Sequence, residues 1–417
     1  MLEYTMAKIT GITILFFVFL TLAPQMAAGE VFEFRHTAGD RYRILSVVRQ
    51  DVFINRRLSH RAEILNRIAV EVLDVIDGKG LHRAIFQTSE RILFDASSRE
   101  VQAAPTGYLW AREYESFFKR DRLGNITIEP QYFMPVVRNV PVFPGRSLRT
   151  LERWRGEGYA VHDFRDAFGI AEPYRIPFTA NYQFIGEQPW RGVFHPAFSI
   201  NFRIDTRPPP VQGYVFPVRI RGNFNQTVFW DRELGQAIAY NETFSLAFDM
   251  SDGRHIEFRG TAEAEFIDSE DMNREQIASD IIEEIERLEI PDVTVRAVDE
   301  GVLISLDDIR FFPDSAVMLP GEEAKLEVIA EILRQFPDRD IKVSGHAALA
   351  GRASREELRQ LSVLRAAAVA HYFITENVRT ADRIVIRGYG VEMPVADNIT
   401  EEGRQRNRRV EIILLEN

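Results

Sequence analysis

The stretch RIVIRGYGVEMPVADNITEEGRQRNRRVEIILL, residues 383–415, decides the fold class of the C-terminal part of this chain. It begins and ends with short apolar runs, and turn-forming residues fill its middle, which is the pattern of two β-strands and their connection. Upstream, the runs GVLISL (301–306) and DIKVSG (340–345) have the same form. This pattern predicts four short strands in the C-terminal part.

Helical patterns separate these strands. After Pro320, apolar side chains recur at helical spacing at Leu326, Ile329, Ala330 and Leu333. Ser354 is a good N-cap for the next helix, and Glu356 and Glu357 fall in its first turn, where the helix dipole favours acidic side chains. The alternation of strands and helices predicts a βαβαβ domain over residues 293–417, with helices packed on a mixed sheet.

Four segments of this region resemble, in the same order, the motifs of the OmpA-like domain, the module that attaches envelope proteins to peptidoglycan. LSVLRAAAVAHYF (361–373) is similar to the family motif LSxxRAxxVxxYL, and IKVSGHAALAG (341–351) stands where the family has its GHTD loop. LDDIRFFPDSAVMLPGEEAKLEVIAEIL (306–333) resembles the family's first strand, loop and helix, and residues 383–412 resemble its closing segment. The C-terminal third of the chain is therefore identified as a member of the OmpA family, most like divergent members from spirochaetes.

The resemblance implies a binding site for the diamino acid of the peptidoglycan stem peptide. In the family, the aspartate of the GHTD loop binds the ammonium group, the arginine of LSxxRA binds the carboxylate, and backbone N–H groups of the loop assist. The corresponding residues here are Gly345, His346, Ala348 and Arg365. The arginine is kept, whereas alanine replaces the aspartate. The resemblance thus predicts that peptidoglycan binding is weak, altered or lost.

Two explanations of Arg365 remain open at this point. It shares a helix face with Leu358, Leu361, Ala368 and Tyr372, and a charge on an apolar face must be paired or solvated. An internal carboxylate or solvent would satisfy it without a ligand, and a ligand carboxylate would satisfy it otherwise. In the second case Glu356 or Glu357 could supply the missing anion. We expect His346 to support its loop by hydrogen bonding.

Residues 30–266 show the period-two alternation of β-strands. In YVFPVRIRG (214–222), Val218 and Ile220 alternate with Arg219 and Arg221. Two interpretations compete: an antiparallel sandwich or curved sheet, and a membrane β-barrel. Barrel strands need roughly ten residues with an uninterrupted lipid face, whereas Pro, Arg and Glu interrupt these runs, which favours the sandwich or curved sheet. The segment RPPPVQG (207–213) predicts a stiff connection between strands or a boundary between two subdomains.

The region 267–292 has a different composition. Its apolar residues recur at helical spacing, at Ile277, Ile281, Ile285 and Leu288. From residue 268 to residue 292 there are ten acidic and two basic side chains, a local charge of −8. This pattern predicts a solvated acidic connector helix between a β-rich domain, residues 30–266, and the C-terminal domain. The expected class of the whole chain is α+β.

The N-terminus has the form of an export signal. Lys8 precedes an apolar run from Ile9 to Leu22, and Ala27 and Gly29 follow at small-residue cleavage positions, which predicts a signal peptide over residues 1–29. The apolar run is shorter than the roughly 20 residues of a bilayer-spanning helix. Without cysteine, the exported chain has neither disulfides nor a lipid-attachment site. We expect a periplasmic location, associated with the outer membrane, and no transmembrane span in the mature chain.

Composition argues against several functions. The net charge of −11 argues against nucleic-acid binding. The eight histidines are scattered without ligand spacing, and no arrangement of catalytic residues is found, so we expect no metal, no cofactor and no enzyme. Three functions remain: a peptidoglycan tether, a structural scaffold that contacts other envelope proteins, and a carrier of an apolar ligand in the N-terminal sheet.

Overall fold

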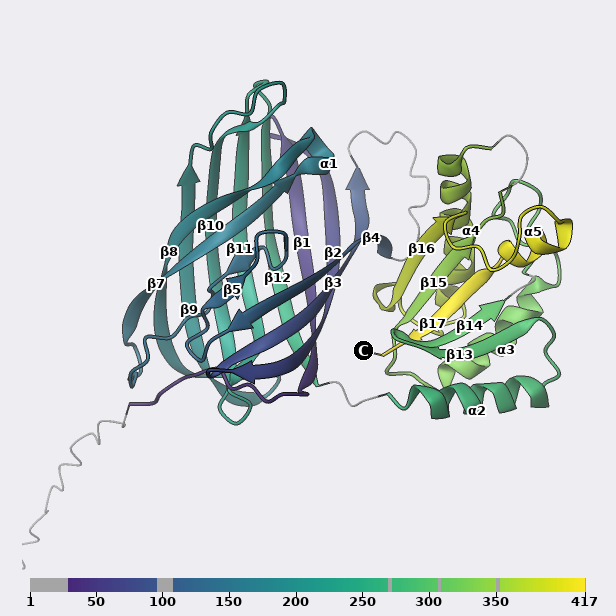
Figure 1. Ribbon diagram of the computed structural model, residues 1–417, viewed down its shortest axis with the longest axis horizontal. Helices are drawn as coiled ribbons and strands as arrows, with labels where there is room; N and C mark the ends of the chain where they lie inside the picture. Colours follow the sequence, from purple (N-terminus) through teal and green to yellow (C-terminus); the bar gives the residue numbers. More distant parts are fainter. Residues whose placement is uncertain (1–28, 96–107, 269–271, 307–308, 350–352, 417) are drawn as a thin grey trace, which may run out of the picture.

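The computed structural model describes residues 29–95, 108–268, 272–306, 309–349 and 353–416. These residues form two units, an N-terminal β-sheet and a C-terminal unit of strands and helices (Figure 1). Apart from Gly29, the predicted signal peptide lies outside the described residues. Of the helices within these ranges, none has both the length and the hydropathy that crossing a bilayer requires.

The N-terminal unit is one antiparallel sheet. Its strands are β1 (Arg41–Ile54), β2 (Arg57–Ile76), β3 (Lys79–Asp95), β4 (Tyr108–Arg120), β5 (Ile126–Ile128), β6 (Val137–Arg138), β7 (Arg153–Phe164), β8 (Ile170–Trp190), β9 (Val193–Thr206), β10 (Pro217–Asp231), β11 (Gln236–Met250) and β12 (His255–Asp268), with the single helical turn α1 (Arg165–Phe168) between β7 and β8. They pair in the order β5-β4-β3-β2-β1-β12-β11-β10-β9-β8-β7-β6. The pairing of β12 with β1 brings the end of this unit beside its start, and the sheet curves strongly (Figure 1).

Tight turns fix the pairing of several strands. Asp77 and Gly78 join β2 to β3 with φ of 51° and 72°, as the two central residues of a type I′ hairpin turn require. Asn55 and Arg56 do the same between β1 and β2, with φ of 51° and 66°. The connection that contains residues 207–213 joins β9 to β10, which are neighbours in the sheet.

An aromatic core fills the inner side of this sheet. Along β8, buried Phe178 and Tyr182 alternate with exposed Thr179 and Asn181. The core includes Phe32, Phe34, Phe143, Trp154, Phe164, Phe178, Tyr182, Phe184, Phe198, Phe202, Trp230 and Phe248. Burying one large apolar side chain contributes roughly 1.5–3 kcal/mol. Of the sandwich and the curved sheet expected from the alternation, the curved sheet is present.

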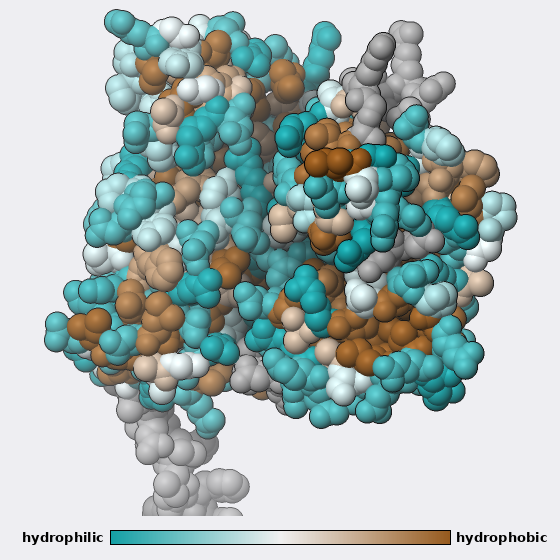
Figure 2. Space-filling model, turned by 45° about the vertical axis from the view of Figure 1, so that its right-hand side comes forward, coloured by the Kyte–Doolittle hydropathy of each residue, from teal (hydrophilic) through white to brown (hydrophobic). Residues whose placement is uncertain are grey.

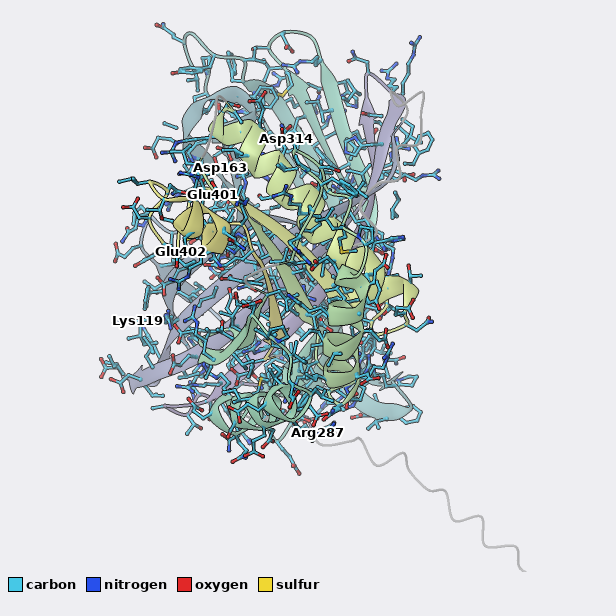
Figure 3. The ribbon with its side chains drawn as sticks, turned by 90° about the vertical axis from the view of Figure 1, so that its right-hand side faces the viewer. Lys119, Asp163, Arg287, Asp314, Glu401 and Glu402 are labelled. Atoms are coloured by element: carbon cyan, nitrogen blue, oxygen red, sulfur yellow. The ribbon has the colours of Figure 1, made fainter. Side chains whose placement is uncertain are left out.

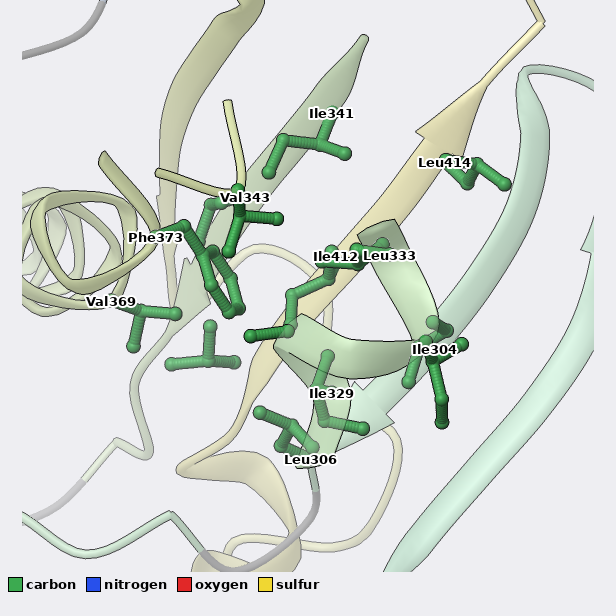
Figure 4. Packing of buried hydrophobic residues seen from close by; sticks show 14 of the residues in the cluster. Ile304, Leu306, Ile329, Leu333, Ile341, Val343, Val369, Phe373, Ile412 and Leu414 are labelled. Carbon is green, nitrogen blue, oxygen red and sulfur yellow. The ribbon is translucent and has the colours of Figure 1, made fainter. Parts of the chain in front are cut away.

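The C-terminal unit has the predicted alternation of strands and helices. Its elements are β13 (Val293–Val298), β14 (Gly301–Leu306), α3 (Glu322–Arg334), β15 (Ile341–His346), α4 (Arg355–Thr375), the 3₁₀ turn η1 (Ala381–Arg383), β16 (Ile384–Gly390), α5 (Glu401–Asn407) and β17 (Val410–Leu415). The sheet order is β13-β14-β17-β15-β16, with β15 and β16 parallel and the other pairs antiparallel. Its core is aliphatic and joins the sheet to α3 and α4, as in the contacts of Ile329, Leu333 and Phe373 (Figure 4).

Helix α2 (Arg274–Arg287) occupies the predicted acidic connector. It is more than a solvated connector, because Ala278, Ile281 and Ile285 are buried in the core of the C-terminal unit. The acidic side chains lie on its other faces. Successive residues of a helix are turned by about 100°, so one segment can have an apolar face and an acidic face. The sequence pattern predicted the helix and its apolar stripe. It did not predict that this stripe packs on the core of the C-terminal unit.

The two units are in direct contact. Tyr108 and Leu109 of β4 pair in parallel with β16. Arg67 of β2 lies 2.5 Å from the carboxylate of Asp340. The guanidinium of Arg387 in β16 lies over the ring of Trp110 in β4, with 4.3 Å between the guanidinium carbon and the ring centre. The N-terminal sheet therefore covers one edge of the C-terminal sheet.

Candidate functional site

The candidate site lies where β15 ends and α4 begins. Ser354 accepts a hydrogen bond from the backbone N–H of Glu357, and the Glu357 side chain accepts one from the N–H of Ser354. This reciprocal capping box confirms the predicted N-cap and fixes the start of α4. Arg365 follows on the face of α4 that is buried with Ser362 and Ala366.

Gly345 allows β15 and α4 to approach closely. A Cβ atom at this position would lie 2.0 Å from the carbonyl oxygen of Ser362. The Ser362 hydroxyl donates to the Arg359 carbonyl and accepts from the N–H of Gly390. Gly345 thus has a packing role that holds the loop after β15 against the helix that carries Arg365.

Arg365 is anchored at one end and open at the other. Its Nε donates to the Ser315 carbonyl at 3.0 Å, and its guanidinium lies 5.0 Å from the centre of the Phe311 ring. Only 9% of the residue is exposed, and within the described ranges its two terminal nitrogens have no hydrogen-bond partner. Burial lowers the pKa of Arg365, the charge of Arg408 lowers it further, and Asp314 opposes both. A guanidinium held in this way can receive a carboxylate on its two open nitrogens.

Ala348 is buried in the loop that follows β15, with 5% of its surface exposed. The backbone on both sides of it is fixed, since the N–H of Ala347 donates to the Gly390 carbonyl at 2.7 Å and the N–H of Leu349 donates to Asn398 Oδ1 at 3.1 Å. Asn407 also donates to Asn398 Oδ1 and so ties the loop to α5. The loop is therefore well supported, although it offers no carboxylate at position 348.

His346, the last residue of β15, stands at the start of this loop and contacts β16 and β17. Its Nε2 lies 3.1 Å from Glu411, and its ring stacks on Tyr389 with 5.0 Å between centres. Burial lowers the pKa of His346, and the hydrogen bond and charge of Glu411 oppose this. Its buried Nδ1 has no hydrogen-bond partner among the described residues. Burial would raise the pKa of Glu411, but the hydrogen bond of His346 and the charge of Arg409 hold that pKa at about 2. The predicted structural use of this histidine matches these contacts.

The two glutamates considered as substitute anions have local partners. Glu356 accepts two hydrogen bonds from Arg359, at 2.9 and 2.7 Å. Glu357 belongs to the capping box. Both carboxylates are thus engaged at the start of α4.

A different carboxylate, Asp314, acts on Arg365. It is exposed in the loop between β14 and α3, one residue before Ser315, whose carbonyl holds the guanidinium. Asp314 and Glu401 lie toward the same end of the C-terminal unit (Figure 3). Sequence reasoning missed Asp314, because in FFPDSA it has only the signature of a turn residue.

Among the described residues, no group of three or more acidic or histidine side chains has the arrangement of a metal site.

Residues 310–408 match the OmpA family. In this part the chain is similar to outer membrane porin F of Pseudomonas fluorescens, with 36% identity over 104 residues, 25% of this chain and 31% of the porin. It is also similar to the peptidoglycan-binding protein ArfA of Mycobacterium tuberculosis, with 36% identity over 106 residues, 25% of this chain and 32% of ArfA. The chain thus spans about a third of the length of these relatives.

A solved structure of an outer membrane protein from Borrelia burgdorferi B31 is also similar. The identity is 32%, and the similarity covers 30% of this chain and 96% of that one, with a TM-score of 0.25. All of these similarities cover about a third of this chain or less.

Proposed function

Residues 310–408 belong to the OmpA family, as the motifs indicated, and from this premise we propose that the protein is a non-enzymatic cell-envelope protein whose C-terminal unit contacts the peptidoglycan stem peptide. The observation that carries the proposal is Arg365, whose Nε is anchored on Ser315 while its terminal nitrogens have no partner in the part of the chain that the structure describes. A guanidinium that is fixed at Nε and has open terminal nitrogens can receive a carboxylate. The proposed location is the periplasm, in association with the outer membrane.

Arg365 binds a carboxylate of the stem-peptide diamino acid in this proposal. The ammonium group of the same ligand has no partner at position 348, because Ala348 stands there. One charge-assisted contact at one end attracts a carboxylate but does not select a zwitterion. Binding is therefore weak, and Asp314 is the carboxylate that supplies what remains of the ammonium contact.

The test is a calorimetric titration of the full chain with a stem-peptide fragment that contains the diamino acid. We expect Ala348→Asp to raise affinity about tenfold to hundredfold, since a charge-assisted hydrogen bond contributes about 1.5–3 kcal/mol. Arg365→Met should abolish the residual binding of the natural chain. Asp314→Asn should weaken it, and Arg296→Gln, an exposed arginine on β13, is the matched control that should not.

Three results would contradict parts of this proposal. Tight binding by the unaltered chain would show that position 348 is not where affinity is lost. Affinity that is unchanged in Arg365→Met would remove the carboxylate contact on which the proposal rests. If Ala348→Asp gains nothing while Arg365→Met still loses binding, the loop holds position 348 away from the ligand.

A scaffold without cell-wall binding is the alternative for the C-terminal unit. Ala348 favours it, because the family contact to the ammonium group is missing. Sedimentation of the full chain with purified peptidoglycan distinguishes the two, since a scaffold stays in the supernatant. Arg365→Met and the unaltered chain would then behave alike.

The N-terminal sheet has a second candidate function, carriage of an apolar ligand. Phe224, Leu246 and Phe258 pack against the inner aromatic core but are only partly buried. Partly exposed aromatic side chains on an inner face offer a surface to an apolar molecule. Mass spectrometry of solvent extracts from the purified chain would detect such a ligand, and an empty extract would count against this role.

A further inference from the structure

A cleft of about 1040 Å³ lies between the two units. The N-terminal sheet lines it with residues of β1, β2 and β12 and with Arg191, which follows β8. The C-terminal unit lines it with α2, with the segment from Gln335 to Asp340 and with Arg383. Hydrophilic surface dominates the seam between the two units (Figure 2). Neither Arg365 nor its loop is part of this cleft.

The cleft is rich in arginine, although the chain as a whole is acidic. Its lining contains the arginines Arg43, Arg67, Arg191, Arg339 and Arg383, and the carboxylates Glu265, Asp338 and Asp340. Five guanidinium groups thus face three carboxylates, in a chain whose net charge is −11. This local excess of two positive charges is opposite in sign to the rest of the molecule.

Ion pairs within the cleft use only some of these arginines. Asp340 is shared by Arg67, at 2.5 Å, and Arg383, at 2.8 Å. Glu265 lies 2.5 Å from Arg191. The guanidinium of the partly buried Arg339 has neither a hydrogen bond nor an ion pair in the part of the chain that the structure describes.

Arg43 shows that the positive charges are crowded. Its nearest carboxylate, Glu416, is 3.6 Å away and is also held by Arg274 at 3.1 Å. Burial lowers the pKa of Arg43 and the charge of Glu416 opposes this, while the charges of Arg339, Arg274 and Arg67 lower that pKa further. Guanidinium groups gathered in a partly desolvated cleft repel one another, and a bound anion would relieve that repulsion.

We propose that this cleft binds a phosphate group that carries two negative charges, as in a phosphate monoester or a diphosphate, with Arg339 as its principal partner and Arg43 as the second. The guanidinium fork matches the oxygens of phosphate and donates two parallel hydrogen bonds. An excess of two positive charges suits a doubly charged group better than a single carboxylate. Because both units supply the lining, the bound group would also hold the two units together.

The test is a titration of the full chain with inorganic pyrophosphate at constant, low ionic strength. We expect binding by the unaltered chain and at least tenfold weaker binding by Arg339→Gln, which removes a charge-assisted contact. Arg296→Gln removes the same charge from an exposed position on β13 and should bind within about twofold of the unaltered chain. Equal affinities of the two variants, or no binding by the unaltered chain, would overturn the proposal.

Circular dichroism of both variants checks that they are folded. If Arg339→Gln is not folded, Arg43→Gln takes its place with the same expectation. The proposal also expects pyrophosphate to raise the melting temperature of the unaltered chain more than that of Arg339→Gln.

Vesicles distinguish the sources of the phosphate group. One set contains phosphatidic acid, whose headgroup is a phosphate monoester, in phosphatidylcholine, and the other contains phosphatidylcholine alone. Binding only to the first set, displaced by pyrophosphate and weakened in Arg339→Gln, assigns the cleft to a lipid headgroup. Pyrophosphate binding without vesicle binding assigns it to a soluble phosphate compound. Vesicle binding that Arg339→Gln and Arg296→Gln share equally, with no effect of pyrophosphate, would refute the cleft as the site.

Discussion

Arg138 in the N-terminal sheet and Arg365 in the C-terminal unit are both buried, but their nitrogens have different surroundings. Each nitrogen of Arg138 has a partner: Nε donates to the Pro135 carbonyl, Nη2 to the carbonyls of Tyr132 and Phe133, and Nη1 to the Tyr159 hydroxyl. Among the described residues, Arg365 donates from Nε alone. The donors of Arg138 are all used within the fold, whereas the open donors of Arg365 are available to a carboxylate.

The same distinction holds within the C-terminal unit. Arg379 is as buried as Arg365, yet it donates to the carbonyls of Leu333, Phe336, Val378 and Arg339. These contacts join the end of α3 to the segment after α4. Burial of an arginine is thus no guide to its role until its donors are followed to their acceptors.

Removal of α2, which lies at the boundary between the N-terminal sheet and the C-terminal unit, should have the largest effect on the free energy of unfolding. A chain of residues 272–417 should fold alone, and a chain of residues 293–417 should be less stable by roughly 5 kcal/mol, because it lacks the buried Met272, Ile281 and Ile285. Urea unfolding followed by circular dichroism measures the difference. Equal midpoints would show that α2 contributes nothing to the core, and failure of 272–417 to fold would show that the unit depends on the N-terminal sheet.

Arg138→Met tests the structural member of the pair of arginines. The substitution keeps an apolar side chain but leaves the carbonyls of Tyr132, Phe133 and Pro135 without a donor. We expect a loss of about 3 kcal/mol in the free energy of unfolding, since each buried acceptor without a partner costs about 1 kcal/mol or more. Chemical denaturation measures it, and a loss below about 1 kcal/mol would mean that water replaces the guanidinium.

Acid tests the buried histidines of the N-terminal sheet. Burial lowers the pKa of His162 to about 4 and contributes most to lowering that of His82 to about 3, whereas an unfolded histidine has a pKa near 6.5. Between these values the unfolded chain binds protons that the folded chain does not, so stability is complete above pH 6.5 and falls as the pH falls. Each histidine should cost about 2 kcal/mol at pH 5. His162→Gln should lose less stability between pH 7 and pH 5 than the unaltered chain.

Arg365→Met should have the smallest effect on stability, below about 1 kcal/mol, because it removes one hydrogen bond, to Ser315, while the apolar Met side chain can still pack beside the Phe311 ring. The same substitution should remove stem-peptide binding. Thermal unfolding and the titration described above, made on the same sample, compare the two effects. A loss of stability as large as that of Arg138→Met would place Arg365 among the structural arginines.

Local patterns in the sequence predicted much of the C-terminal unit. The strand GVLISL, the apolar stripe of α3 and the cap at Ser354 all depend on neighbouring residues, and all three are present. The acceptor of Arg365 is a backbone carbonyl 50 residues away, and no sequence pattern marks a carbonyl. The pairing of β4 with β16 is likewise set by tertiary contact.

The sequence predicted the β-structure of the N-terminal unit but not the length of its strands. Its strands reach 21 residues in β8, far longer than the alternating runs in the sequence. Bulges shift the register, as between His162 and Phe164, and reverse the alternation partway along a strand. Polar residues such as Gln226 and Glu242, which share a hydrogen bond within β10 and β11, also interrupt it. A long strand with such interruptions looks like several short ones.

The pairing of β4 with β16 has a consequence for aggregation. Without β4, β16 would be the outermost strand of the C-terminal sheet, and its unpaired N–H and C=O groups would accept a strand from another copy of the chain. Ile384, Val385 and Ile386 make this edge apolar as well as open. The contact at Tyr108 and Leu109 occupies that edge within the same molecule. The N-terminal sheet therefore protects its neighbour from growing into strand-linked oligomers, whatever ligand either unit binds.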